Sequence, residues 1–437
     1  MHQSFGGGPL RRISRLRMLG GRIHAQMLWG LVDQGCLSAA NFALTVAAAR
    51  LLGPAGLGQV FVGFTFFLFS LSLQRALVSD PLVVVSARLG VEERLKATRA
   101  ATTATVSLAA VMVIVTCAAG LGLPARIGGG LALFAPWILP AMLNELFRTA
   151  LFRDQRGAEG ARNGVVALLV IVVAMAVTTQ VPSDWAVVSA WGLGGLAAAL
   201  LGLVCTRAWP SRLAESWRWW LEEAWPLGRW LGAESLVING RLQLYTLLLA
   251  AVLGTTDLGG LRAAESLFAL MTLVGPALSV AGLPAITRAL ARSVSDALGL
   301  ATRISGIALA VVAVYLVGVG VARAEVMGLV FGQEFVAFAH LVIPIGVAQL
   351  LGGGVLGYTL FLKACSAGRS LFRYQIAFSV LVLGLSVGLA VRYGAEGAAW
   401  GYTAACLLAG GIMVVLAYRV GARRADQART VQPAIDR

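Results

Sequence analysis

"ARLLGPAGLGQVF" occupies residues 49–61, and "AAVLGTTDLGGLRA" occupies residues 250–263. Each stretch ends one long apolar run and begins another. Gly53 and Gly58 of the first stretch recur 201 residues later as Gly254 and Gly259. Glycine supplies backbone freedom in a tight turn and lets neighbouring helices approach closely. A single corner of this kind indicates only a turn. Its recurrence at this spacing predicts that the chain is built from two related halves.

The chain around these corners is strongly apolar: 58% of its 437 residues are hydrophobic and only 13% are charged. A soluble domain carries about 25% charged residues, so lipid is the expected solvent for much of this surface. A membrane span needs about 20 mostly apolar residues. We predict an all-α integral membrane protein with about 12 transmembrane helices in two six-helix lobes related by a parallel pseudo-two-fold repeat. The predicted spans lie near residues 28–50, 57–79, 101–122, 130–152, 163–181, 185–205, 229–252, 259–282, 299–320, 336–360, 372–391 and 397–418.

Positive charges follow a regular pattern between the spans. If the N-terminus is cytoplasmic, 28 of the 35 Lys and Arg residues fall on inner segments and five fall on outer segments. The remaining two, Arg75 and Arg241, lie within spans. This bias follows the positive-inside rule and predicts that both termini are cytoplasmic. It also accounts for most of the net charge of +15, so we expect no nucleic-acid partner.

The repeat divides the chain into five predicted parts. Six is an even number of spans, so both halves enter the membrane from the same side and are related by an axis along the membrane normal. The connection between them contains five of the eleven tryptophans, interleaved with Arg and Glu, which is typical of a helix lying in the headgroup zone. The parts are a basic cytoplasmic tail (1–22), an N-terminal lobe (23–205), this interfacial linker (206–228), a C-terminal lobe (229–418) and a second basic cytoplasmic tail (419–437).

Four segments resemble one known family. They are "DQGCLSAANFALTVAAARLLGPAGLGQVFVGFTF" (Asp33–Phe66), "RALVSDPLVVV" (Arg75–Val85), "LGTTDLGGLRAAESL" (Leu253–Leu267) and "GAEGAAWGY" (Gly394–Tyr402). These segments are similar to polysaccharide and oligosaccharide flippases of the multidrug/oligosaccharidyl-lipid/polysaccharide exporter superfamily. The resemblance implies a V-shaped pair of lobes around a central cavity. It also implies alternating-access export of a polyprenyl-pyrophosphate-linked oligosaccharide across the bacterial cytoplasmic membrane, for O-antigen, capsule or exopolysaccharide assembly.

The flippase interpretation has to be weighed against two other functions, a drug or cation antiporter and a membrane enzyme. A drug or cation antiporter of the same superfamily requires an acidic cavity, whereas the candidate mid-membrane charge here is basic. A membrane enzyme that processes glycans requires paired carboxylates or a nucleophile on a sizeable loop, and the predicted outer loops are short.

The five cysteines stand singly and the three histidines are scattered, so we expect no metal site and no cofactor. The expected partners of this transporter are a lipid-linked glycan, the bilayer, H⁺ or Na⁺ as coupling ion, and polysaccharide assembly machinery.

Charges and amides inside spans are the candidate substrate contacts, because ionisable groups there are costly and usually face a cavity or a partner. Arg241 lies near the middle of span seven, and its planar fork suits a pyrophosphate. The alternative is a buried ion pair with Glu234 or Glu265. Arg75 lies near the inner end of span two, where it can also reach the cytoplasm. The predicted cavity residues are Arg241, Arg75, Asn41 and Asn239.

Three carboxylates are candidates for ion coupling or gating: Asp33, Glu234 and Glu265. Asp33 and Glu234 are related by the 201-residue repeat, and each lies near the start of a span. They either carry a coupling proton or pair with arginines on the cytoplasmic side. Glu145 and Arg148 are three residues apart in span four, so we expect them to neutralise each other, and the same spacing relates Glu265 to Arg262.

Overall fold

The computed structural model describes the backbone of residues 9–435. Side chains are described within residues 26–426, except those of Met27, Arg126, Thr272, Leu273, Pro276 and Val280. Most side chains of the two predicted basic tails, 1–22 and 419–437, therefore lie outside the described residues.

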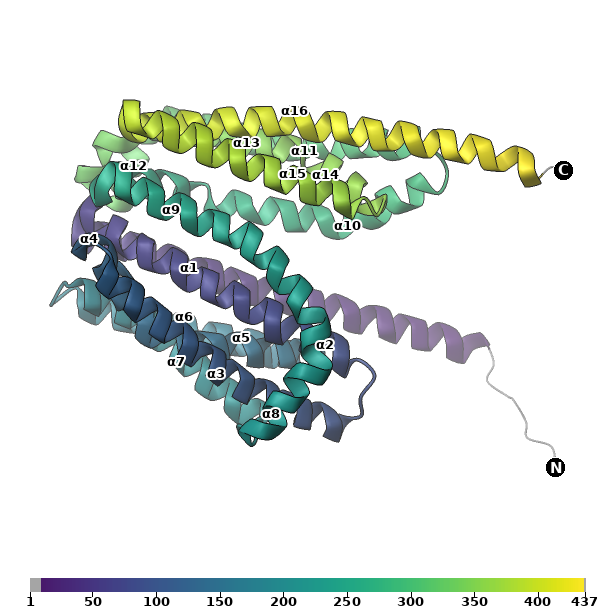
Figure 1. Cartoon of the computed structure of the whole chain (residues 1–437), viewed down its shortest axis with the longest axis horizontal. Coiled ribbons are helices and arrows are strands. Elements are labelled where there is room, and N and C mark those ends of the chain that lie inside the picture. Colours follow the sequence, from purple (N-terminus) through teal and green to yellow (C-terminus); the bar gives the residue numbers. More distant parts are fainter. Residues whose placement is uncertain (1–8, 436–437) are drawn as a thin grey trace. The chain divides into compact units, whose positions relative to one another are not determined.

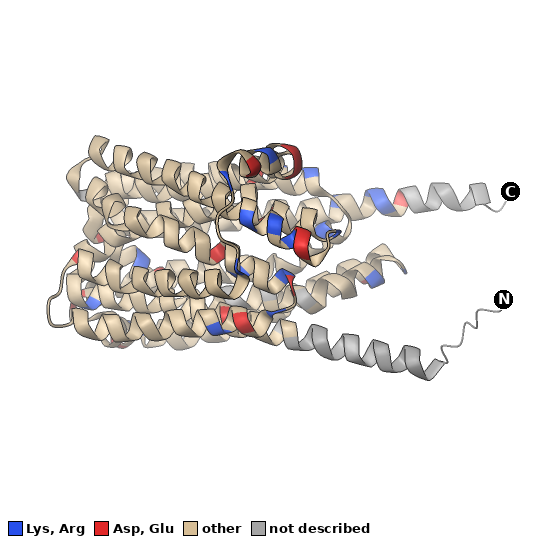
Figure 2. Ribbon diagram, turned by 90° about the horizontal axis from the view of Figure 1, so that it is seen from below, with Lys and Arg blue, Asp and Glu red and all other residues tan. Residues whose placement is uncertain are grey.

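Residues 9–435 are helical throughout, with short connections and no strand, which confirms the all-α prediction. Within this part of the chain, nine stretches are long and apolar enough to cross a membrane. Three of them run for 55 to 59 residues, whereas one crossing requires only about 20. Each of these three contains a glycine with positive φ, namely Gly53, Gly254 or Gly394. Figure 1 follows the helices along the chain, and Figure 2 shows long stretches without charge between charged helix ends.

The chain forms two compact units. The first comprises the described residues up to Leu44, Phe67–Leu121 and Ala132–Ser235. Its core forms where α7 packs against α5 and α6, and where the ring of Trp191 meets those of Phe67 and Phe134 edge to face. Its elements are the N-terminal part of α1 (Pro9–Gln74), the π-helical turn η1 (Arg75–Ser79), α2 (Asp80–Ser86), α3 (Val91–Gly122), the 3₁₀ turn η2 (Ala135–Trp137), α5 (Ile138–Arg153), α6 (Gly157–Thr178) and α7 (Asp184–Thr206).

The predicted interfacial linker also belongs to this first unit. It leaves α7 through Arg207, which adopts a left-handed conformation, and continues without regular structure to Arg212. A short helix follows, α8 (Leu213–Trp219), and then a π-helical turn, η3 (Trp220–Ala224). The linker is therefore partly helical, as its Trp- and Arg-rich composition predicts, but its first segment is an irregular strap of residues 208–212.

The second unit comprises Thr45–Phe66, Gly122–Leu131 and the described residues from Leu236 onward. In it α11 packs against α10, α13 and α14, around buried side chains such as Phe361, Tyr374 and Met413. Its elements are α4 (Ala125–Phe134), α9 (Trp225–Leu267), η4 (Ala269–Leu273), α10 (Val274–Leu290), α11 (Val294–Val321), α12 (Arg323–Phe331), η5 (Gln333–Leu341), α13 (Val342–Gly354), α14 (Leu356–Ala364), α15 (Gly368–Leu381), η6 (Val382–Val387) and α16 (Gly388–Ile435).

The two repeated corners adopt nearly the same backbone conformation. Gly53 interrupts α1 at φ 67°, ψ −173°, and Gly254 interrupts α9 at φ 78°, ψ 175°. This region of conformational space is open to glycine and strained for other residues. The structure thus explains why a glycine stands at this position in both halves.

The second glycine of each corner has a different role, which is close packing. A Cβ added to Gly58 would collide with the carbonyl oxygen of Thr255, and one added to Gly259 would collide with that of Pro54. Because Pro54 and Thr255 are themselves 201 residues apart, these two contacts are reciprocal. The corners cross each other at their glycines, and this crossing lies wholly within the second unit.

This crossing accounts for the division of the chain. Residues 45–66, from the first corner, group with the second unit, and α9 up to Ser235 groups with the first. The predicted lobes, 23–205 and 229–418, follow sequence order alone. Their boundaries remain a prediction.

Candidate functional site

A small cavity with a mostly apolar wall and several polar side chains lies inside the first unit, between α1, α5, α6 and α7. Its volume is about 140 Å³. Apolar rings form part of its wall, those of Phe67, Trp137 and Trp191. Six polar or charged side chains also line it: Asp33, Asn41, Asn144, Glu145, Arg148 and Asn163. The structure thereby places two of the predicted site residues, Asp33 and Asn41, in one cavity.

Four charged groups form a chain of ion pairs beside this cavity. Arg148 Nη1 lies 2.7 Å from Asp33 Oδ2, and Arg148 Nη2 lies 2.7 Å from Glu145 Oε2. Glu145 Oε1 in turn lies 3.2 Å from the Nε of Arg75. The charges alternate in sign and sum to zero. Arg75 joins this network through the π-helical turn η1, and more than half of its side chain remains exposed.

Local sequence explains how these groups come together. Glu145 and Arg148 are three residues apart on α5, so they lie on the same face of the helix. Gly164 on α6 leaves room for α1, since a Cβ there would lie 3.1 Å from Asp33 Oδ1. Asp33 is buried, with 5% of its side chain exposed, and a charge at that depth requires a partner. Arg148 supplies that partner.

Asn163 is the most distinctive amide of the cavity. It is 1% exposed, and within the described part of the chain neither end of its side chain has a hydrogen-bond partner. An unpaired buried amide costs free energy, so such a group is usually satisfied by water or a ligand. With both carboxylates held by arginines, the cavity offers a neutral polar surface with one open amide. This arrangement suits a small polar species or a proton better than a highly charged substrate.

Arg241 lies in the second unit, far along the chain from this cavity. Its guanidinium carbon is 4.7 Å from the centre of the Phe378 ring, which in turn stacks on Tyr374. Its Nη1 is buried and has no hydrogen-bond partner among the described residues. The side-chain amide of Gln243, two residues further along α9, is likewise buried and unpaired. Span seven therefore contains a cation and an amide whose hydrogen bonds are unmet.

The expected alternative for Arg241, an ion pair, is not formed among the described residues. Glu265 pairs with Arg262 at 2.5 Å, as its spacing predicts, and Arg262 also donates to the Oγ1 of Thr246 at 2.6 Å. Glu234 is exposed and does not approach Arg241 within ion-pair distance. Asn239 is partly buried on the same helix. Neither predicted gating carboxylate of the second half neutralises Arg241.

Four of the six polar side chains in the cavity wall are not predicted as site residues by the sequence: Asn144, Glu145, Arg148 and Asn163. Asn163 stands in "ARNGVV" beside a glycine at the start of an apolar run, which is a weak signal for a polar wall. The spacing of Glu145 and Arg148 predicts only that they neutralise each other. Their link to Asp33 joins residues 115 apart in sequence, so it depends on how α1 packs against α5.

The fold itself has known counterparts, although no protein-family model and no curated protein sequence matches this chain. A solved structure described as the inward-facing conformation of a multidrug resistance MATE family transporter of the MOP superfamily matches with a TM-score of 0.75 and 13% identity, over 89% of this chain and 95% of that one.

Two further solved structures are similar. The lipid II flippase MurJ, in an inward closed conformation, matches with a TM-score of 0.68 and 11% identity over 93% of each chain. A MOP superfamily transporter from Pyrococcus furiosus, whose reverse polarity of binding pocket suggests a different function, matches with a TM-score of 0.60 and 13% identity over 92% of this chain and 96% of that one. The chain therefore has the fold of MOP-superfamily transporters and is a multi-pass membrane protein.

Proposed function

We propose that this chain is a flippase that moves a polyprenyl-pyrophosphate-linked oligosaccharide across the bacterial cytoplasmic membrane by alternating access. We further propose twelve spans, with both termini in the cytoplasm. Fold similarity to a lipid II flippase and to multidrug transporters supports the transporter class. The observation that carries the choice of substrate is Arg241, a cation within a span that no described carboxylate neutralises.

The chemistry of Arg241 favours an anionic substrate. A guanidinium in a low-dielectric setting is costly without a counter-charge, and an aromatic ring such as Phe378 offsets only part of that cost. A pyrophosphate offers oxygens in the geometry that the planar fork binds bidentately. Gln243 and Asn239 are amides on the same helix that can hydrogen-bond phosphate or sugar oxygens. Substrate headgroups thus supply hydrogen-bond partners for Arg241 Nη1 and for the amide of Gln243, which have none among the described residues.

Coupling to an ion gradient is assigned to the first unit. Asp33 is the only carboxylate in the sequence of α1, and its charge is balanced by Arg148. Protonation of Asp33 would leave Glu145 as the only carboxylate that pairs with Arg148. The cluster would then carry a net positive charge. H⁺ is therefore the coupling ion that this network handles most directly, with Na⁺ the other candidate. Glu234 and Glu265 remain candidates for gating.

A drug or cation antiporter is the second candidate, because the solved neighbours include multidrug transporters and because two carboxylates line the cavity of the first unit. A cationic substrate needs an excess of negative charge at its site. Here each cavity carboxylate already has an arginine partner, which removes that excess. One solved neighbour is itself described by the reverse polarity of its binding pocket. The sign of the charge at the binding site is therefore the feature that discriminates the antiporter from the flippase.

The test is transport by variants of Arg241 reconstituted in proteoliposomes. We expect Arg241→Ala to lower the rate of translocation of a fluorescent polyprenyl-pyrophosphate glycan by about 10- to 100-fold, the value of a charge-assisted contact with phosphate. Arg241→Lys should recover part of the rate, because it restores the charge but not the fork. Both variants should insert and elute as folded protein.

The matched control is Arg392→Ala. Arg392 also lies over an aromatic ring, Tyr393, at 5.6 Å, but it is exposed. Its removal should leave transport unchanged. Normal glycan-lipid transport by Arg241→Ala, or efflux of cationic drugs by the wild type with no glycan-lipid transport, would contradict the proposal and favour the antiporter.

A further inference from the structure

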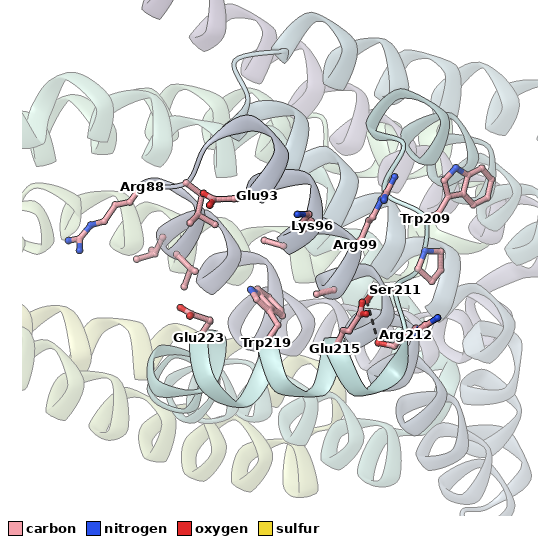
Figure 3. Close-up of a pocket in the computed structure, with 16 residues that line it drawn as sticks. Arg88, Glu93, Lys96, Arg99, Trp209, Ser211, Arg212, Glu215, Trp219 and Glu223 are labelled. Atoms are coloured by element: carbon pink, nitrogen blue, oxygen red, sulfur yellow. Dashed lines mark hydrogen bonds between the residues drawn. The ribbon is translucent and has the colours of Figure 1, made fainter.

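A second cavity lies in the first unit, away from the site described above. It opens between the turn that joins α2 to α3 and the interfacial linker, and its volume is about 1250 Å³. Arginines, a lysine and tryptophans line it, including Arg88, Lys96, Arg99, Arg212, Trp209 and Trp219. Figure 3 shows that they come from both walls, the start of α3 on one side and the linker on the other.

Hydrogen bonds from α3 hold the linker wall in place. Thr102 Oγ1 donates to the carbonyl of Ala208 at 3.1 Å, and Thr103 Oγ1 donates to that of Ser211 at 3.0 Å. Ser216 Oγ of α8 donates to the carbonyl of Ala100 at 2.7 Å. The first two bonds satisfy carbonyls of the non-helical strap, which have no helical hydrogen bond, and the third ties α8 to α3. Hydrogen bonds between α3 and the linker therefore hold the two walls of the cavity together.

Two arginines lie at one end of this cavity, and one of them, Arg99, has an unmet hydrogen bond. Arg99 and Arg212 lie together with Trp209 at that end in Figure 3, and Arg88 lies at the other. Neither Arg99 nor Arg212 forms an ion pair within the described part of the chain, although Glu215 also lines the cavity. The Nε of Arg99 and the indole nitrogen of Trp219 are buried and have no hydrogen-bond partner among the described residues.

The remaining acids of the wall do not cancel these arginines. Glu93 accepts a hydrogen bond from the backbone nitrogen of Gly90 at 3.1 Å, which caps the start of α3. Glu223 lies toward Arg88 in Figure 3. Glu215 lies at the same end as Arg99 and Arg212 in Figure 3, so this end holds two arginines and one carboxylate, and its excess of positive charge attracts an anion.

An apolar cavity of about 240 Å³ lies on the other side of α8. Leu108 and Val111 of α3 line it, together with Leu213 and Trp217 of the linker. Arg212 lines the charged cavity and the next residue, Leu213, lines the apolar one, so the walls of the two cavities adjoin where α8 begins. Along α3, Arg99 and Val111 are about 18 Å apart at 1.5 Å per residue. A charged cavity next to an apolar cavity suits an amphiphilic ligand, which has a charged headgroup and an apolar chain.

We propose that this pair of cavities binds an anionic glycerophospholipid, distinct from the transported substrate. Its phosphate lies between Arg99 and Arg212, where guanidinium forks bind phosphate oxygens. Trp209 and Trp219 flank the headgroup as interfacial tryptophans do, and an acyl chain follows Leu108 and Val111. Such a lipid fastens the linker to α3 and makes the position of the linker depend on the anionic lipid content of the membrane.

Native mass spectrometry of the full-length protein tests this site. Delipidated wild type is incubated with phosphatidylglycerol or with phosphatidylcholine, and the bound lipid is measured. We expect the wild type to prefer phosphatidylglycerol, and Arg99→Gln/Arg212→Gln to lower phosphatidylglycerol occupancy by about tenfold or more, since each arginine contributes a charge-assisted bond. Arg218→Gln/Arg229→Gln is the control, because it removes the same charge from exposed positions on α8 and α9 outside the cavity wall.

Three results would overturn the proposal: equal binding of the two lipids by the wild type, an equal loss in both double variants, or complete displacement of phosphatidylglycerol by excess inorganic phosphate, which would indicate a site for the free anion. Arg212→Gln alone provides a variant that folds, because Arg212 is exposed in an irregular segment, and it should still lower phosphatidylglycerol occupancy. Unchanged occupancy in that variant would also count against the site.

Discussion

Arg148 and Arg241 show how differently one residue type is used within spans. Arg148 contacts two carboxylates at 2.7 Å, so its charge is neutralised inside the protein. Arg241 contacts the face of Phe378, and its Nη1 has no partner among the described residues. A paired buried charge is chiefly structural, whereas an unpaired one retains binding capacity. The first arginine therefore holds its unit together, and the second is the better candidate for an anionic ligand.

Removal of Arg148 tests its structural role. Arg148→Ala leaves Asp33 and Glu145 buried without their main partner, and we expect a loss of about 3–5 kcal/mol of stability. Arg156→Ala is the matched control. Arg156 also pairs with a glutamate three residues away, Glu159, but its side chain is 40% exposed. Exposed pairs contribute about 0–1 kcal/mol. Thermal unfolding in detergent should show a large fall in Tm for the first variant and a small one for the second; equal shifts would refute the distinction.

Among the elements, the repeated corners carry the strongest internal symmetry. Leu57 and Leu258 are both fully buried, as are Phe67 and Phe268 to within 2%. The equivalence fails at Asp33 and Glu234, because Asp33 is buried and paired whereas Glu234 is exposed. Symmetry of packing is thus retained where the corners cross, and symmetry of charge is not.

Alanine at the crossing glycines should separate the corners. Gly58→Ala and Gly259→Ala each force a Cβ against a backbone carbonyl, and overpacking of this kind costs about 1–3 kcal/mol. Gly240→Ala on α9 is the control, because its Cβ meets nothing within 4 Å and alanine favours a helix over glycine by about 1 kcal/mol. We expect a lower Tm for the first two variants and an unchanged or higher Tm for the third. If all three behave alike, the crossing does not constrain the fold.

The molecule as a whole is predicted to cross the membrane twelve times with both termini inside. The three longest apolar stretches each bend at a positive-φ glycine, which allows two crossings apiece. Labelling of single cysteines tests this topology in a chain whose five native cysteines are replaced by serine. Pro182→Cys should react with a membrane-impermeant maleimide on intact cells, because it is exposed and lies in a predicted outer loop, and Ala87→Cys should react only after permeabilisation. The reverse pattern would invert the topology, and labelling of both positions from outside would contradict the span count.

Features that depend on a run of neighbouring residues follow from the amino-acid sequence alone. Apolar length predicts helices that cross a membrane, and the glycines at 53 and 254 predict corners because left-handed backbone favours glycine whatever surrounds it. The spacing of Glu145 and Arg148 predicts their pairing because a helix repeats every 3.6 residues. All three expectations agree with the structure.

Features that depend on which helices meet do not follow from the sequence in this way. Asp33 finds Arg148 across 115 residues, and Thr103 holds Ser211 across 108. Nothing in the sequence selects these partners, because many arginines and carbonyls compete for each donor or acceptor, and only packing decides which one is within about 3 Å. The same holds for Arg241, for which the sequence offers several carboxylate partners and which the folded chain instead places against a ring. Composition and local geometry are properties of the chain, whereas the pairing of buried charges is settled by the contacts that helices make once they are packed.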